Sequence, residues 1–158
     1  MSSSSKTLSK NLAKQLARDY TQFKFIAGQT AVYSASDNSI TFLESANEKD
    51  DWTLLHELAH GVLAHNTYST DFELLKLESQ AWQKAVEIGK NYGVNIDEEH
   101  IQMCLDTYRD WLHRRSACPT CSLRSPQINS STYRCLNCKT EWQVKSDRFV
   151  RPYRLKSL

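Results

Sequence analysis

A short segment at residues 56–60, His-Glu-Leu-Ala-His, has the residue types and the spacing of a metal-hydrolase site. Residues four apart lie one above the other on a helix, so His56 and His60 could each direct a ring nitrogen at one ion. Glu57 lies roughly 100° round the helix from His56. It could therefore reach a water at the ion's open position, where a general base acts. The segment predicts two metal ligands and a base.

Apolar residues surround this motif on the predicted helix, which we expect to run from Trp52 to His65 with Asp50 or Asp51 as its N-cap. They are Leu54, Leu55, Leu58, Ala59, Val62 and Leu63. Two histidines and a glutamate would be costly to bury on such a helix unless they are bound to something, and a metal ion supplies that partner. A pair of solvated histidines is the alternative for so short a pattern.

A catalytic zinc takes three protein ligands and a water, and Glu78 is the favoured third ligand. It lies on a second predicted helix that Ser69 or Thr70 can cap and that runs to about Tyr92. A carboxylate in the middle of an apolar stripe must be neutral, paired or metal-bound. That stripe consists of Leu74, Leu75, Ala81, Trp82, Ala85 and Ile88. A buried pair with Arg109 or a histidine, or an exposed groove position, are the alternatives for Glu78.

Four of the five cysteines form two Cys-x-x-Cys pairs, Cys118/Cys121 and Cys135/Cys138, separated by 13 residues. This spacing predicts two knuckles that close a tetrahedral zinc site, and four protein ligands leave no open position, so this zinc is structural. Such a site is typical of a reducing compartment, which favours a cytoplasmic protein. Cys104 is expected to be a small core residue rather than a nucleophile or ligand.

Charge divides the 158-residue chain into two parts. Residues 1–112 carry 10 Lys and Arg against 16 Asp and Glu, whereas 113–158 carry 10 against 2. We therefore predict two modules, a metallopeptidase domain at 1–115 and a basic zinc ribbon with its tail at 116–158. Basic residues interleaved with aromatic ones suit phosphate contact and base stacking. The candidate nucleic-acid-binding residues are Arg134, Lys139, Lys145, Arg148 and Arg151, and the aromatic residues are Tyr133, Trp142, Phe149 and Tyr153. A solvated basic surface, or docking on the acidic module, is the alternative.

The remaining pattern predicts an α+β fold. An amphipathic helix over Thr7–Tyr20 precedes three β-like runs at 22–27, 31–36 and 39–44, and a further helix runs from about Asp97 to His113-Arg114-Arg115. We expect a small antiparallel sheet packed with a zincin helix pair and further helices, followed by the small zinc-ribbon domain.

No stretch approaches the ~20 apolar residues of a membrane span, so no membrane partner is expected. The Ser-rich start lacks a secretory apolar region; a frayed tail is expected, with an organellar transit peptide as the alternative.

Two family resemblances rest on these residues. The run Leu54–His60 with His65, followed by Glu78-x-x-Ala81-Trp82, resembles the ImmA/IrrE group of intracellular zinc peptidases over roughly residues 25–92. This resemblance implies a gluzincin site with His56, His60 and Glu78 as ligands and Glu57 as base, in a group that acts on DNA-bound repressors and related regulators. The C-terminal ribbon resembles that of SprT-like proteases, which use a third histidine downstream. Here no histidine occurs between His65 and His100.

The predicted function is a zinc-dependent endopeptidase with two zinc ions per chain, one catalytic and one structural. The zinc would polarise the scissile carbonyl while Glu57 takes the proton of the attacking water. We expect a protein or peptide substrate to add a strand beside Ser39–Glu44, and the ribbon to serve as a targeting module. His65 is expected to be a second-shell or C-terminal-turn residue, and the oxyanion helper to be Tyr68, His100 or Tyr108.

Two further hypotheses stay open at this point. In the first, the chain is a nucleic-acid-binding or adaptor protein whose His-Glu-Leu-Ala-His metal only stabilises the fold. In the second, it is a regulated protease whose ribbon binds a protein partner rather than DNA.

Overall fold

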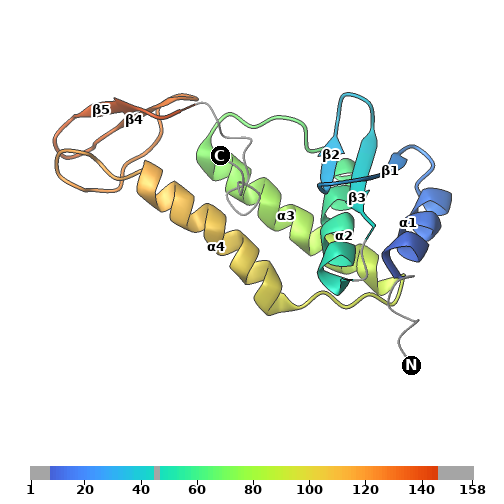
Figure 1. The fold of residues 1–158 in the computed structure, drawn as a ribbon. Helices are drawn as coiled ribbons and strands as arrows, with labels where there is room; N and C mark the ends of the chain where they lie inside the picture. The colour runs from blue at the N-terminus through green and yellow to red at the C-terminus, as the bar shows by residue number, and fades with distance from the viewer. Residues whose placement is uncertain (1–7, 45–46, 146–158) are drawn as a thin grey trace. The chain divides into compact units, whose positions relative to one another are not determined.

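The structure, a computed structural model, describes residues 8–44 and 47–145 (Figure 1). Four helices and two small sheets make it a mixed α+β protein within these residues, as predicted. Residue contacts group the chain into two compact units, Met1–Asn66 with Ser79–Asp97, and Thr67–Glu78 with Glu98–Leu158. The helix after residue 97 thus groups with the ribbon. The division into modules at 115/116 stays a prediction.

The first unit contains α1 (Leu8–Asp19), β1 (Lys24–Gly28), β2 (Val32–Ser34), β3 (Ser39–Leu43), α2 (Glu48–Val62) and the part of α3 (Asp71–Lys90) from Ser79 onward. The second unit contains the start of α3 together with α4 (Glu98–Arg115), β4 (Thr132–Arg134) and β5 (Glu141–Gln143). Leu12 and Leu16 are buried on α1, as its amphipathic pattern predicts. None of the helices within the described residues combines the length and the hydropathy that a membrane span requires.

The three-stranded sheet has the order β1-β3-β2, with β1 parallel to β3 and β2 antiparallel to it. The prediction of an antiparallel sheet is therefore right for β2 with β3 and wrong for β1. The segment Ser39–Glu44, which was expected to take a substrate strand beside it, instead holds the central strand. The burial of side chains explains the order. Ile40 and Phe42 of β3 are buried, whereas Ile26 of β1 and Val32 of β2 remain 48% and 42% exposed. The strand that buries the most apolar surface takes the centre of the sheet.

Helix α2 begins earlier than predicted and uses a different cap. Asn47 is the N-cap, and its side-chain oxygen accepts a hydrogen bond from the backbone N–H of Lys49 at 3.0 Å. Asp50 and Asp51 lie in the first turn, where a negative charge normally stabilises the helix by interacting with its free backbone N–H groups. The proposed caps at Asp50 and Asp51 were wrong because the helix extends to Glu48.

Asp51 is an exception to the benefit of acidic residues in a first turn. Its side chain is only 6% exposed, and its Oδ1 has no hydrogen-bond partner among the described residues. Burial, followed by repulsion from Asp50 and Glu48, raises its pKa from the usual 3.8 to about 6. The Asp51 carboxyl group thus binds its proton more tightly in the folded state than in the unfolded state. At neutral pH, where the group is ionised, it therefore opposes folding.

We expect Asp51→Asn to stabilise the protein at pH 7.5, by about 3 kcal/mol at most, since one pKa unit corresponds to about 1.4 kcal/mol. As the pH falls from about 6 to 3.8, Asp51 becomes protonated in the folded wild-type protein and no longer opposes folding. The difference in free energy of unfolding between the variant and the wild type should therefore shrink over this pH range. Urea unfolding of both proteins at pH 7.5 and pH 4 measures it. Using the difference between the proteins cancels effects of metal loss. An equal difference at both pH values would contradict the prediction.

Helix α3 begins with a capping box. The Thr70 hydroxyl accepts a hydrogen bond from the Glu73 N–H at 3.2 Å, and the Glu73 carboxylate accepts one from the Thr70 N–H at 3.4 Å and another from the Ser69 N–H at 2.7 Å. The predicted cap at Ser69 or Thr70 is confirmed, with Thr70 in the capping position. Two turns later the same helix carries Glu78.

Candidate metal centre

Three side chains of the first predicted site come together. One ring nitrogen each from His56 and His60 and one carboxylate oxygen of Glu78 lie within 4.8 Å of one another. His56 is 0%, His60 4% and Glu78 1% exposed. Both histidines lie on α2, and Glu78 lies on α3. Arg109, the alternative partner, instead donates to Asp106 and Gln102.

The donor set fits a zinc ion. The two Nε2 atoms of His56 and His60 face each other at 3.1 Å. Zinc–nitrogen bonds of about 2.0–2.1 Å at a tetrahedral angle would place two such nitrogens roughly 3.3 Å apart. Two imidazoles and a carboxylate, all buried, are also the ligand types of a catalytic zinc with one position left for water. The described residues therefore form a candidate metal site of the predicted composition.

Trp82 supports the first histidine and was not recognised as a site residue from the sequence. Its ring stacks on that of His56, with centroids 4.2 Å apart and an interplanar angle of 28°. Trp82 is 2% exposed. It lies four residues after Glu78, on the same face of α3, and this spacing is the signal that could have revealed it. The stack limits rotation of the His56 ring.

Glu57 is fully buried and is oriented by the sheet. Its Oε2 accepts a hydrogen bond from the backbone N–H of Tyr33 in β2 at 2.9 Å. Because that N–H is directed away from β3, Glu57 lies at the open edge of β2. The contact involves a backbone group, so no side-chain pattern in the sequence could have predicted it.

A glycine permits this close approach of strand and helix. A Cβ at Gly61 would lie 2.9 Å from the Phe23 ring and 3.2 Å from the Tyr33 ring. Gly61 follows Glu57 by four residues, so both lie on the same face of α2. The missing side chain lets β2 come near enough for the Tyr33 amide to reach Glu57.

Comparisons with protein-family models, with curated proteins and with solved structures gave no match. The resemblances to ImmA/IrrE-like and SprT-like proteases therefore stay hypotheses. The support for a function comes from the chemistry of the described side chains.

The second predicted site is also assembled. The four cysteines Cys118, Cys121, Cys135 and Cys138 each place a sulfur within 4.8 Å of the others. The Sγ atoms of Cys118 and Cys138 are 3.6 Å apart, and those of Cys121 and Cys135 are 3.4 Å apart. Zinc–sulfur bonds of about 2.3 Å at a tetrahedral angle would separate two sulfurs by roughly 3.8 Å. The cluster is therefore compatible with the predicted structural zinc.

The two knuckles have the same backbone form. The N–H of Ser122 donates to the Cys118 carbonyl at 2.8 Å, and the N–H of Lys139 donates to the Cys135 carbonyl at 3.1 Å. Both Ser122 and Lys139 adopt a positive φ, 65° and 63°. The backbone N–H of Cys138 donates to Cys135 Sγ, and this is the main cause that lowers the pKa of the Cys135 thiol to about 6. Such turns favour the thiolate that zinc requires.

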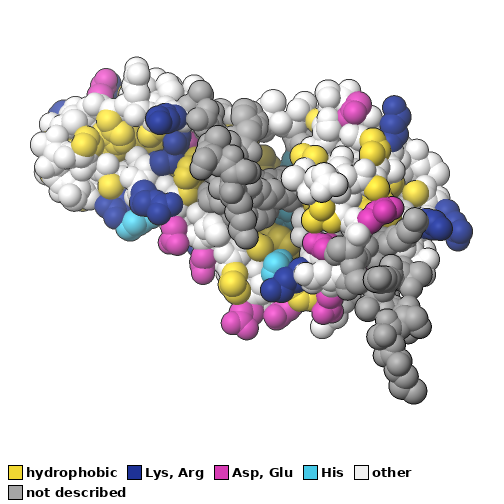
Figure 2. Space-filling view, viewed as in Figure 1, with side chains coloured by type: hydrophobic (Ala, Val, Ile, Leu, Met, Phe, Trp, Pro, Cys, Tyr) yellow, Lys and Arg dark blue, Asp and Glu magenta, His cyan; other side chains and the backbone are white. Residues whose placement is uncertain are grey.

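Only some of the candidate nucleic-acid-binding side chains of the ribbon are exposed and available to a ligand. Figure 2 shows Lys and Arg side chains at the ribbon surface, and both Lys139 and Lys145 are exposed. Arg134, however, is paired with Glu141 across β4 and β5. Tyr133 is 2% exposed and stacks on Trp142, so it cannot serve as a base-stacking platform. The predicted contacts at Arg148 and Arg151 and the aromatic residues Phe149 and Tyr153 lie outside the described residues.

A buried acidic residue joins α3 to the ribbon within the second unit. Asp71 is 0% exposed; its Oδ2 accepts hydrogen bonds from Arg115 Nε at 2.9 Å and from the Tyr133 hydroxyl at 2.7 Å. Its backbone N–H donates to Gln127 Oε1 at 2.8 Å. Arg115, the last residue of α4, is thus a structural partner, with a side chain 14% exposed.

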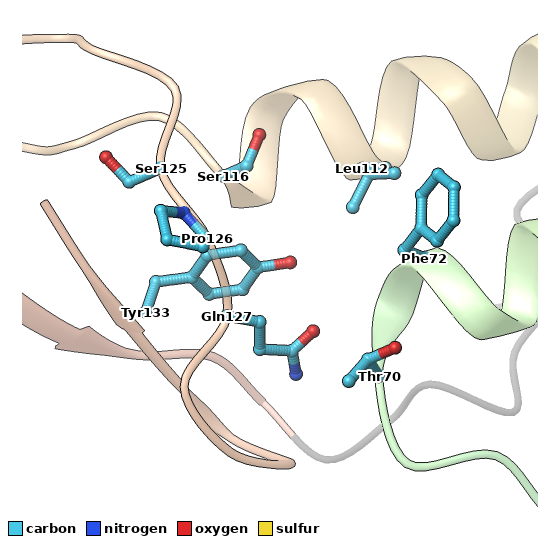
Figure 3. A pocket seen from close by; sticks show the side chains of 8 residues that line it. All are labelled: Thr70, Phe72, Leu112, Ser116, Ser125, Pro126, Gln127 and Tyr133. Atoms are coloured by element: carbon cyan, nitrogen blue, oxygen red, sulfur yellow. The ribbon is translucent and has the colours of Figure 1, made fainter. Parts of the chain in front are cut away.

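A cavity of about 390 Å³ lies beside this buried cluster (Figure 3). Phe72 and Leu112 line one end of it, and Pro126 and Tyr133 line the other. Phe72 is 65% exposed, so the cavity opens at an apolar rim.

The remaining sequence candidates have mixed outcomes. Cys104 is half-buried rather than fully buried, and its sulfur lies 3.6 Å from His100 Nε2, one turn back on α4. The assignment of an oxyanion residue among Tyr68, His100 and Tyr108 stays a prediction. His65, expected in the second shell or the C-terminal turn, contacts His60: their Nδ1 atoms lie 2.9 Å apart.

Proposed function

We propose that this chain is a zinc-dependent endopeptidase. One observation carries the proposal: the buried carboxylate of Glu57 is held at the open edge of a β-strand and is adjacent in sequence to a histidine of the candidate metal site. A metal that merely stabilised the fold would not need a buried carboxylate held in this way. Burying a charged carboxylate is costly even when it is hydrogen-bonded, and Glu57 lies beside the candidate ligands, where a general base acts.

The roles of the residues follow from their chemistry. His56 and His60 would bind zinc through Nε2 and Glu78 through a carboxylate oxygen. When bound, the zinc would polarise the scissile carbonyl and lower the pKa of a coordinated water towards ~7. Glu57 accepts the proton of the attacking water and delivers it to the amine nitrogen that leaves. The hydrogen bond from Tyr33 keeps the Glu57 side chain in one orientation during both transfers.

The substrate would lie extended along β2 rather than along β3. Strand β3 is paired on both sides, whereas the outer side of β2 is paired with no described strand. The outward N–H of Tyr33 is already used by Glu57, so an extended peptide would lie beside this edge and pair with the Tyr33 carbonyl, with its side chains giving specificity. We propose that the peptide bond to be cut lies near Tyr33, because Glu57 is held there.

The ribbon is proposed to be a targeting module in a cytoplasmic protease that acts on a DNA-associated or regulatory protein. The four clustered thiols are arranged for a metal rather than for disulfides, which is typical of a reducing compartment. Of the candidate residues that the structure describes, Lys139 and Lys145 are exposed and suited to phosphate contact.

Counting zinc per chain by elemental analysis is the first test. We expect two zinc ions in the wild type and close to one in Glu78→Ala, because the loss of one of three ligands weakens the catalytic site while the cysteine site is untouched. Glu87→Ala, on the exposed side of the same helix, is the matched control and should retain two. Cleavage of an unfolded protein substrate should then depend on the second zinc. A wild-type chain with a single zinc in the presence of excess zinc would reject the proposed function.

A further inference from the structure

The chain reverses direction immediately after helix α2. The helix ends at Val62, Leu63 is the C-cap, and Ala64 has a positive φ of 55°. The N–H of His65 donates to the His60 carbonyl at 2.9 Å, and the N–H of Ala64 donates to the Gly61 carbonyl at 3.0 Å. These two bonds form a Schellman motif. This motif brings His65 back over the last turn of α2, although the sequence alone suggested that the helix continued to residue 65.

The left-handed conformation at Ala64 costs energy. A non-glycine residue pays roughly 1–2 kcal/mol for it. Glycine would avoid most of this cost and is the residue most often found at this position of the motif. The turn is therefore held by its surroundings rather than by the local preference of Ala64. Strained residues of this kind are concentrated at functional sites.

The reversal places two imidazoles in direct contact. The Nδ1 atoms of His60 and His65 lie 2.9 Å apart, with ring centroids 5.1 Å apart and an interplanar angle of 64°. The other ring nitrogen of His60, Nε2, faces His56 Nε2 at the candidate metal site. His60 thus uses one nitrogen toward the metal site and the other toward His65.

We infer that His65 is a positioning residue for the metal centre, an inference that rests on the proposed function. Neutral His65 accepts, through its Nδ1 lone pair, the Nδ1–H of His60. This hydrogen bond holds His60 in the tautomer whose Nε2 lone pair is available to a metal, and it fixes the plane of the ring. Histidines that bind metals generally donate their second N–H in this way, and loss of the acceptor typically lowers metal affinity 10–100-fold.

The nature of the acceptor has a consequence for the charge of the site. A carboxylate at this position would add a negative charge beside His60, whereas a neutral imidazole adds none. With Glu78 as the one carboxylate among the three ligands, zinc and its ligands would together keep a net positive charge, which faces the Glu57 carboxylate beside them. A positive centre is the better one for polarising a carbonyl and acidifying a water.

Two substitutions separate positioning from a merely structural role. His65→Leu removes the acceptor. His65→Asn keeps one, because the Oδ1 of Asn occupies roughly the place of the histidine Nδ1. Zinc affinity of the His56/His60/Glu78 site is measured by competition with a chromophoric chelator, in the full-length protein with its ribbon zinc in place. We expect His65→Leu to weaken zinc binding at this site about 10–100-fold and His65→Asn to recover most of that loss. His113→Leu, a change of the same size at an exposed histidine of α4, should have no effect.

A spectroscopic measurement completes the test. In zinc-loaded wild-type protein the Nδ1 proton of His60 should be visible by NMR as a slowly exchanging resonance, and it should be lost from slow exchange in His65→Leu. Unchanged zinc affinity in His65→Leu would overturn the inference. Equal losses of zinc affinity in His65→Leu and His65→Asn would also overturn it. They would show that the hydrogen-bond acceptor has no effect and that the imidazole ring acts only through its packing.

The outcomes also separate this inference from the proposed function. If the wild type binds two zinc ions and cleaves no peptide, the proposed function fails, while the effect of His65 on zinc affinity still decides the inference. If the wild type binds zinc at the cysteines alone, both are rejected. If cleavage is confirmed and His65→Leu keeps full affinity, the inference alone is rejected.

Discussion

Glu57→Gln should lower peptide-bond hydrolysis by about 10²–10⁴-fold, the usual contribution of a positioned general base. Glutamine has nearly the same shape, and its side-chain oxygen can still accept the hydrogen bond from the Tyr33 N–H. The variant cannot accept a proton from water, however. The loss should therefore appear in kcat rather than in KM, because peptide pairing along β2 does not involve the proton transfer.

The controls for this experiment come from the same chain. Glu87→Gln makes the same chemical change at an exposed position of α3 and should keep full activity. Glu57→Gln should also keep two zinc ions per chain, since Glu57 is not among the residues that could hold the metal. Cleavage at the wild-type rate by a zinc-loaded Glu57→Gln protein would eliminate Glu57 as the base.

Asp71→Ala should destabilise the second unit by about 3–5 kcal/mol, the usual effect of removing one partner of a buried ion pair. The variant leaves the half-buried Arg115 guanidinium without its carboxylate partner and removes the acceptor of the Tyr133 hydroxyl. Tyr133→Phe deletes only that hydroxyl and should cost less, about 1.5–3 kcal/mol, as for other hydrogen bonds to a charged group.

Hydrogen exchange measured by mass spectrometry is the suitable readout, because it reports each segment separately. Asp71→Ala should reduce protection in the peptides that cover 67–78 and 98–145. Asp106→Ala, which breaks the exposed ion pair with Arg109 on α4, is the matched control and should cost below about 1 kcal/mol. Equal effects of Asp71→Ala and Asp106→Ala would show that the buried cluster does not stabilise this unit.

This cluster bears on the site as well as on stability. Asp71 and Glu78 lie on the same helix, two turns apart, and both belong to the second unit. Contacts of Asp71 with Arg115 and Tyr133 therefore connect the ribbon to the helix that carries the third candidate ligand. We expect a ribbon emptied of zinc to loosen the start of α3, which the same exchange experiment would detect.

The outcome for the sheet illustrates where periodicity fails. Three short β-like runs were correctly located, but their order was not, since alternation of apolar residues says which face of a strand is buried and not which strand is its neighbour. Short spacing between successive runs suggested hairpins. Burial of Ile40 and Phe42 instead placed β3 between the other two strands, and this moved the expected substrate edge to β2.

The candidate metal ligands could be predicted from residue types and spacing alone. Spacings of three and four residues bring His56 and His60 together on one helix and close each cysteine knuckle, because helix and turn geometry are local. Glu78 was also predictable, since a carboxylate inside an apolar stripe requires a partner.

The surroundings of these residues depend on the way the chain packs. Four contacts formed by packing or by an unexpected turn illustrate this. They are the hydrogen bond from the Tyr33 amide that orients Glu57, the stacking of Trp82 on His56, the contact of His65 with His60, and the buried pairing of Asp71. Such contacts depend on the strand order, the helix end at Val62 and the space left by Gly61, none of which follows from residue spacing alone. Ligand identity is thus a local property of this chain, whereas the orientation of each ligand and of the base is a property of its fold.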